Sequence, residues 1–97
     1  MRIVIIGAGK LGYSIAQLLS QEGYSVVLVD REEKQLESAK NSLDILTIGV
    51  NGASLAAYED PDISGAELLI AATGSDEVNM VAAILAKKQG ISFAAAR

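Results

Sequence analysis

The sequence contains neither cysteine nor histidine. The missing cysteines exclude disulfide bonds, thiolate metal sites and cysteine nucleophiles. The missing histidines exclude the usual general base near neutral pH, the Ser–His and Cys–His dyads, and imidazole ligands for zinc. Many enzyme classes are therefore excluded by these two absences alone.

Positive charge and long hydrophobic runs are also scarce. Eight Lys and Arg stand against twelve Asp and Glu, a net charge of −4. This balance argues against nucleic-acid binding, which needs a clustered basic surface. The longest apolar run, Met80 to Ala86, is far shorter than the roughly 18 residues of a membrane span. With 97 residues, 51% of them hydrophobic, we expect one small cytoplasmic domain covering residues 1–97.

Short apolar runs rich in β-branched residues alternate with helical patterns along the chain. The runs expected to form strands are Arg2–Ile6, Ser25–Asp30, Leu43–Ile48, Glu67–Ala72 and Ile91–Ala95. The second and fourth are continuously apolar, which is typical of strands covered on both faces in a parallel sheet. The alternation predicts an α/β fold, a single Rossmann-like, doubly wound parallel sheet with strand order 3-2-1-4-5.

Helical segments are expected between the strands. They are a first helix that ends at Gly23, a second at about Glu32–Lys40, a short turn at Ser54–Tyr58 and a long helix at Asp76–Gln89. The stretch from residue 60 to 62, Asp-Pro-Asp, is expected to be a break. The inward face of the first helix is expected to carry four residues that recur at helical spacing: Leu11, Ile15, Leu18 and Leu19.

Residues 7–12 read Gly-Ala-Gly-Lys-Leu-Gly, a G-x-G-x-x-G motif that follows the first expected strand and opens a helix. Gly7 would permit the tight turn, Gly9 would let the backbone approach a pyrophosphate, and Gly12 would let helix and strand pack closely. The free N–H groups of the helix N-terminus then favour an anion. This context predicts a phosphate loop, in which Lys10 either lies near the phosphates or is an exposed helix lysine.

An acidic residue, Asp30, closes the second expected strand, 18 residues after Gly12. A carboxylate there accepts hydrogen bonds from the ribose hydroxyls of an adenosine and repels a 2′-phosphate, which favours NAD(H) over NADP(H). The adjacent Arg31 can instead accommodate a 2′-phosphate or lie over the adenine. The alternative is that Asp30 only caps the following helix. If Asp30 binds ribose, Asp30→Ala weakens that binding and leaves the fold intact.

The turn after the fourth expected strand reads Thr-Gly-Ser-Asp-Glu-Val-Asn-Met over residues 73–80. Together with the glycine loop and Asp30, this run resembles the N-terminal, Rossmann-type half of the RCK domain, also called KTN or TrkA-N. It matches the T-x-x-D-E-x-N-M pattern of that family without a gap, and the resemblance covers essentially the whole chain. Domains of the family regulate potassium channels and transporters.

The resemblance implies that the glycine loop holds a diphosphate and that Asp30 holds the adenosine ribose. It places Thr73 and Gly74 near the diphosphate and the second ribose, and it implies that Arg97, at the end of the fifth strand, pairs with a phosphate. The expected ligand contacts are Gly7, Ala8, Gly9, Lys10, Leu11, Gly12, Asp30, Arg31, Gly52, Ala53, Ser54, Thr73, Gly74 and Arg97.

The sequence departs from the family pattern in two places. After the third expected strand the family has G-D-A-T, whereas Gly52, Ala53 and Ser54 fit only with one residue fewer, so the adenine contact stays open. The chain also ends at the fifth strand, without the family's sixth strand and crossover helices. We expect a minimal form or a fragment, truncated relative to the full RCK domain.

The last expected helix is apolar nearly all round. It is either an alanine-rich helix with a wide core face, or a helix whose second face is buried in a subunit contact. In the resembling family, helices of this half contribute to subunit assembly, which favours a homo-oligomer. The face expected to pack on the sheet carries Val78, Val81 and Leu85, and the second face carries Met80, Ala83 and Ile84.

Three functions are consistent with these residues. The favoured one is a regulatory module, not an enzyme, that binds NAD(H), with ATP or ADP as the alternative. It would control a membrane potassium transporter or channel, at the inner face of the membrane, through ligand-dependent subunit rearrangement. The second is the coenzyme half of an NAD-dependent oxidoreductase, which the missing histidine and the missing Tyr-x-x-x-Lys pair disfavour. The third is an assembly module that has lost nucleotide binding. We expect no metal site, because the carboxylates of Glu32, Glu33 and Glu37 fit a solvated helix face.

Overall fold

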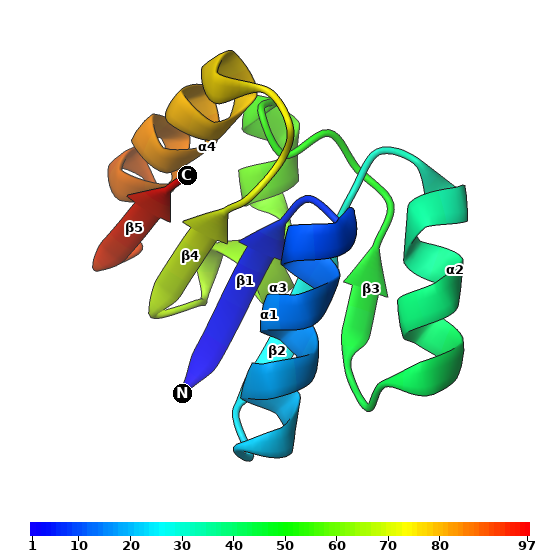
Figure 1. Ribbon diagram of the computed structural model, residues 1–97. Coiled ribbons are helices and arrows are strands. Elements are labelled where there is room, and N and C mark those ends of the chain that lie inside the picture. Colours follow the sequence, from blue (N-terminus) through cyan, green and yellow to red (C-terminus); the bar gives the residue numbers. More distant parts are fainter.

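Five parallel strands form one sheet in the computed structural model, which describes residues 1–97 (Figure 1). Their order is β3-β2-β1-β4-β5, so β1 is central and the chain crosses from one half of the sheet to the other between β3 and β4. The predicted Rossmann-like sheet and its strand order are thereby confirmed. The strands are β1 (Arg2–Ile6), β2 (Ser25–Val29), β3 (Leu46–Ile48), β4 (Leu68–Ala71) and β5 (Phe93–Ala96).

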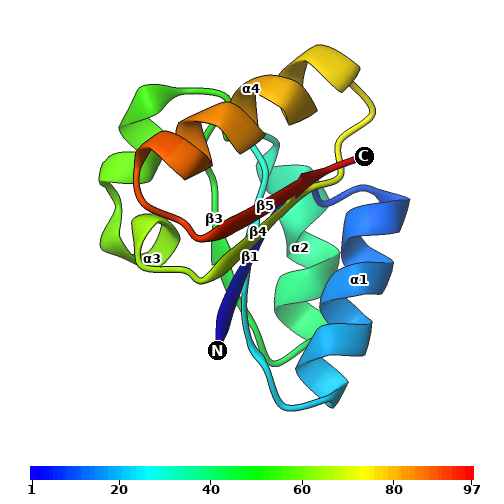
Figure 2. The same cartoon turned by 90° about the vertical axis from the view of Figure 1, so that its left-hand side faces the viewer.

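Helices cover both faces of the sheet (Figure 2). On one face lie α1 (Lys10–Gln21) and α2 (Glu33–Ser42), and on the other lie the 3-10 helix η1 (Leu55–Glu59), the single turn α3 (Pro61–Ser64) and the long α4 (Asp76–Lys88). Each face has its own buried cluster. Side chains of β1 alternate between the two: Ile3 and Ile5 join the cluster under α1 and α2, and Val4 and Ile6 join the other.

Two strands, β3 and β5, begin two or three residues later than expected, and β4 begins one residue later. β3 begins at Leu46, while Leu43 and Ile45 pack against the cluster under α1 and α2 without joining the ladder. β5 begins at Phe93, because the N–H of Ile91 donates to the Ala86 carbonyl at 3.0 Å and so belongs to the turn that ends α4.

The segment expected to be a break forms α3 instead. Asp60 is its N-cap, and its Oδ1 accepts a hydrogen bond from the Asp62 N–H at 2.9 Å. Pro61 occupies the first helical position, where a missing N–H costs nothing. The turn buries Ile63 completely. The Asp-Pro pair thus begins a helical turn here and does not interrupt the chain.

Small residues, and not leucines, form the inward face of α1. Its buried residues are Gly12 and Ala16. The cause is close approach to the sheet, because a Cβ on Gly12 would lie 1.7 Å from the Gly7 carbonyl oxygen. The predicted leucine face was therefore wrong in part: Ile15 and Leu19 are half-buried, whereas Leu11 and Leu18 are exposed.

The inward face of α4 is also made of small residues, together with one amide. Asn79, Ala82 and Ala86 are its buried residues. Val78 and Leu85 flank them and are half-buried. Val81, which was predicted to face the sheet, is exposed. None of the helices combines the length and the apolar character that crossing a membrane requires.

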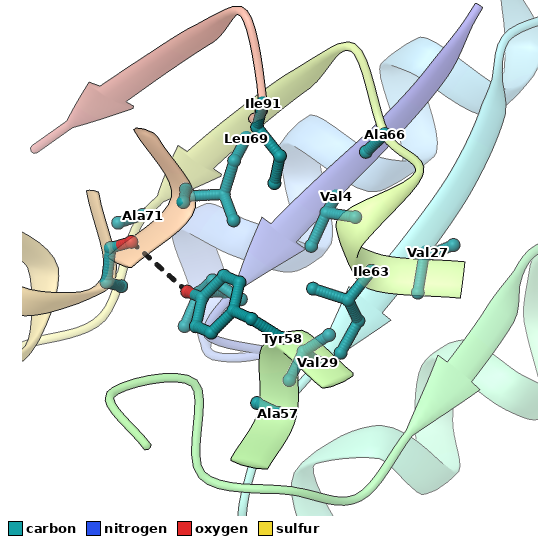
Figure 3. Close-up of a cluster of buried hydrophobic side chains, with 13 residues drawn as sticks. Val4, Val27, Val29, Ala57, Tyr58, Ile63, Ala66, Leu69, Ala71 and Ile91 are labelled. Atoms are coloured by element: carbon teal, nitrogen blue, oxygen red, sulfur yellow. Dashed lines mark hydrogen bonds between the residues drawn. The ribbon is translucent and has the colours of Figure 1, made fainter. Parts of the chain in front are cut away.

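Tyr58 is a fully buried side chain that joins three parts of the chain (Figure 3). Its hydroxyl donates towards two carbonyl oxygens, that of Gly52 at 2.8 Å and that of Ala82 at 3.2 Å. The dashed line in Figure 3 marks the second of these. Burial raises the pKa of the Tyr58 hydroxyl to about 12, because the phenolate would lose its hydration.

We expect the stability of the domain to fall between pH 10 and pH 12. The pKa of Tyr58 in the folded state lies above the ordinary value of 10.0, so the protonated phenol contributes fully below pH 10. This contribution, about 2–3 kcal/mol, is lost as pH rises through 12. Tyr58→Phe should lose about 1 kcal/mol at pH 7 and decline less steeply above pH 10.

Urea unfolding over a series of pH values measures both effects. Tyr24→Phe is the matched control, because Tyr24 is exposed. A wild-type decline no steeper than that of Tyr58→Phe would contradict the prediction.

Candidate functional site

A cleft opens at the carboxyl edge of the sheet, where β1 and β4 diverge into opposite connections. This is the topological switch point at which doubly wound sheets bind ligands. The cleft has a volume of about 180 Å³. Its lining comes from the loops after β1, β2, β3 and β4, and consists of Ile6, Gly7, Asp30, Arg31, Asn51, Gly52, Thr73, Gly74, Ser75 and Val78.

A second hollow lies on the other side of Gly74, at the start of α1. Gly74 lines both, so the two form neighbouring parts of one edge of the sheet. Two of the residues lining this hollow, Lys10 and Arg97, carry positive charge. The full lining is Gly9, Lys10, Leu11, Ser14, Ala72, Gly74 and Arg97.

The three glycines of the loop occupy the positions that the motif predicts. Gly7 has a φ of +107°, which L side chains rarely adopt, and a Cβ on it would lie 3.0 Å from the Ala72 carbonyl. Gly12 packs against the Gly7 backbone, as described above. A Cβ on Gly9 would meet nothing within 4 Å. Gly9 therefore leaves open space at the place where a diphosphate would approach.

The N-terminus of α1 is open to an anion. No side chain caps it, and its first turn has no acidic residue. In α4, by contrast, Ser75 caps the N-terminus at the Val78 N–H, and the first turn carries Asp76 and Glu77. Of α1 and α4, only α1 has an N-terminus with neither a side-chain cap nor an acidic residue in its first turn, so its positive end stays available to an anion.

Asp30, half-buried at the end of β2, ties the glycine loop to the turn that leads into α2. Its Oδ2 accepts from the Ala8 N–H at 2.8 Å, and its Oδ1 accepts from the Glu32 N–H at 2.8 Å. Each oxygen keeps a second lone pair that can accept from a ribose hydroxyl. Asp30 is not itself the N-cap of α2, because that position belongs to Glu32.

The rim formed by the β4–α4 turn is built around a buried amide. Asn79 Oδ1 accepts from the N–H of Thr73 at 2.9 Å and from its hydroxyl at 2.6 Å, and Asn79 Nδ2 donates to the Thr73 carbonyl at 3.1 Å. Thr73 lines the cleft as expected, but its N–H and hydroxyl already have partners within the chain. Ser75 and Val78 line the cleft as well and were not predicted.

The rim after β3 lacks two of its three expected residues and contains one that was not expected. Asn51 and Gly52 line the cleft, whereas Ala53 and Ser54 do not. The Ser54 hydroxyl is engaged in capping η1 at the Ala56 N–H. A Cβ on Gly52 would lie 2.4 Å from Ile6 Cγ2, so only glycine fits there. Asn51 went unpredicted, although an Asn beside a glycine is a common turn signal.

The remaining predicted residues lie around the same edge. Ala8 is buried inside the glycine loop and Leu11 is exposed beside the second hollow. Arg31 is exposed and lines the cleft. The Arg97 N–H donates to the Ala71 carbonyl at 2.9 Å, which holds the end of β5 beside β4. No group of Asp and Glu side chains is arranged to hold a metal ion.

Residues 3–97 match the family model of the TrkA-N domain. The chain belongs to this family. It is 38% identical over 97 residues to the Trk system potassium uptake protein TrkA homolog of Methanothermobacter thermautotrophicus. This match covers 100% of this chain and 45% of that relative. It is 46% identical over 87 residues to the trkA homolog 1 of Methanosarcina mazei. That match covers 90% of this chain and 21% of the relative. The TrkA-N chain thus spans less than half the length of these relatives.

Solved structures agree on the fold. The NAD(P)-binding domain of an exopolyphosphatase-related protein from Archaeoglobus fulgidus superposes with a TM-score of 0.85 at 18% identity, covering 98% of this chain and 71% of that one. The resemblance read from the sequence is confirmed at the level of family and fold.

The two hydrogen bonds of Asp30 change what its substitution should do. We expect Asp30→Ala to lower the free energy of unfolding by about 1–3 kcal/mol without any ligand, because the buried Ala8 N–H and the Glu32 N–H lose their acceptor. Asp44→Ala, which removes an exposed carboxylate, should change it by less than about 0.5 kcal/mol. Urea unfolding measures both. Equal stability of the two variants would mean that Asp30 does not hold the loop.

Proposed function

We propose that this TrkA-N domain binds NAD(H) along the carboxyl edge of its sheet and acts as the regulatory module of a potassium uptake system. One observation carries the proposal: the uncapped N-terminus of α1 and the Asp30 carboxylate share that edge. A dinucleotide laid across it would place its diphosphate at α1 and its adenosine ribose at Asp30. Lys10 and Arg97 would add positive charge on the diphosphate side.

The proposed ligand has an unphosphorylated adenosine ribose. Asp30 would accept from both ribose hydroxyls and repel a 2′-phosphate, which favours NAD(H) over NADP(H). ATP and ADP share the adenosine and phosphate chemistry and remain the alternative ligands. Gly52 and Asn51 would lie on the adenosine side, since they line the cleft together with Asp30.

The proposed role is regulatory and not enzymatic. Asp30 and Arg31 are the only charged residues lining the cleft, and neither is placed as an acid–base pair for hydride or acyl transfer. A ligand can instead regulate by binding two arrangements of the protein unequally. The relatives are named as potassium uptake proteins of the Trk system. We therefore propose that the regulated partner is a membrane potassium transporter or channel subunit, contacted from the cytoplasmic side.

The outward face of α4 is the proposed contact between copies of this chain. Met80 is 62% exposed and Ile84 is 51% exposed. The first turn of α4 carries Glu77 and its last turn carries Lys88. Two such helices packed antiparallel about a two-fold axis would bring opposite charges together at both ends of an apolar centre.

Calorimetry of the domain with NAD, NADH, NADPH, ATP and ADP at one salt concentration tests the ligand proposal. We expect NAD or NADH to bind, and NADPH to bind at least about tenfold more weakly. Gly9→Val should abolish binding, because its side chain fills the space beside α1, while stability changes by less than about 1 kcal/mol. A folded Gly9→Val domain with wild-type affinity would contradict the site. If the wild type binds none of these nucleotides, the result would favour an assembly module that has lost nucleotide binding.

Sedimentation equilibrium tests the contact between copies. We expect the wild type to associate, and Ile84→Asp to shift it to monomer, because a carboxylate at the centre of an apolar contact is costly to desolvate. Leu18→Asp, on the equally exposed surface of α1, is the matched control and should leave association unchanged. A wild type that stays monomeric at the concentrations used for calorimetry would contradict the proposal.

A further inference from the structure

Two rims of the cleft are attached to α4 by buried polar side chains. Asn79, in the second turn of α4, binds Thr73 of the β4–α4 turn. Tyr58, in η1, links the Gly52 carbonyl after β3 to the Ala82 carbonyl of α4. Neither Asn79 nor Tyr58 lines the cleft itself.

Asn79 determines which donors the β4–α4 turn can offer. Its side chain is 0% exposed, and its amide uses both polar atoms on Thr73. A buried amide is costly to leave without partners, so its orientation is fixed. Because the N–H and hydroxyl of Thr73 are occupied, the adjacent Gly74 N–H, which has no hydrogen bond within the chain, is the free donor of this rim. Gly74 is exposed and lines both the cleft and the second hollow, so a ligand can reach it.

Tyr58 has the corresponding role on the adenosine side. Its hydroxyl holds the Gly52 carbonyl at 2.8 Å, and the Gly52 backbone is also pressed against Ile6. The loop after β3 is thereby fixed between the sheet and α4.

We propose that Asn79 and Tyr58 are positioning residues for the nucleotide. Asn79 directs the Gly74 N–H towards the diphosphate and second nucleoside. Tyr58 fixes the position of the Gly52 backbone beside the adenosine. This inference rests on the proposed function. It predicts that Asn79 affects the ligand that carries a second nucleoside and spares AMP, which a general loss of stability would not do, whereas Tyr58 affects the adenosine part that both ligands share.

Calorimetry with NADH and with AMP, well below the unfolding temperature, separates the two roles. Asn79→Ala should weaken NADH about tenfold and AMP by less than about twofold, because AMP lacks the second nucleoside. Tyr58→Phe should weaken both ligands by similar factors of about tenfold. Asn41→Ala and Tyr24→Phe are matched controls at exposed positions and should leave both affinities unchanged.

A second variant guards against misfolding of Asn79→Ala. Thr73→Val removes the hydroxyl that donates to Asn79 and accepts from the Ser75 N–H at 3.1 Å, while the Asn79 side chain stays, and it should reproduce the selective loss of NADH affinity. If the variants fold and their affinities are unchanged, the positioning roles are overturned and the proposed function stands. The same holds if every variant loses affinity for NADH and for AMP by equal factors. A wild-type domain that binds neither ligand would overturn the proposed function and these roles with it.

Discussion

Close packing of helices on the sheet through small side chains is the constraint on which the rest of the structure depends. Gly12 and Ala16 bring α1 onto the sheet, and Ala82 and Ala86 do the same for α4. A helix packed this closely has its N-terminus directly at the carboxyl ends of the strands. The location of the candidate nucleotide site therefore follows from core packing as much as from the residues that line it.

The same constraint places large apolar side chains on the surface. Where glycine and alanine occupy the inward face of a helix, its larger residues lie on the flanks or on the outside, as Leu18 and Met80 do. Phe93, on the edge strand β5, is exposed to 70%. Together with Met80 and Ile84 it lines a shallow apolar hollow between α4 and β5.

Local sequence patterns predict much of this architecture. The alternation of apolar runs and helical segments predicts the sheet and its order, and the context of the glycine motif predicts the tight turn at Gly7 and the close packing at Gly12. Asp30 was predicted because it is an acidic residue at the end of a buried strand, and it lines the cleft. The inward faces of α1 and α4 were mispredicted because hydrophobic periodicity does not report how closely a helix approaches the sheet.

The hydrogen bonds of Tyr58 and Asn79 were not predicted, for a different reason, although Asn79 belongs to the motif over residues 73–80. Their hydrogen-bond partners are set by the tertiary structure: Tyr58 reaches Ala82, 24 residues away. A single Asn within a helical pattern looks like a solvent-facing residue until the helix is placed on the sheet. Ala53 and Ser54 were expected at the cleft because a one-residue gap in a loop can be aligned in more than one way, whereas the structure places Asn51 there beside the expected Gly52.

The glycine loop has a consequence for how such a domain could report on its ligand. Its N–H groups at Gly7 and Ala8 are held by β2, and Gly12 locks it to α1. A preorganised loop loses little conformational entropy when it binds a phosphate, so it supplies affinity efficiently. For the same reason it would bind equally well in any arrangement of subunits, and equal binding shifts no equilibrium. Discrimination between states would have to come from the opposite rims, which are attached to α4 through Asn79 and Tyr58.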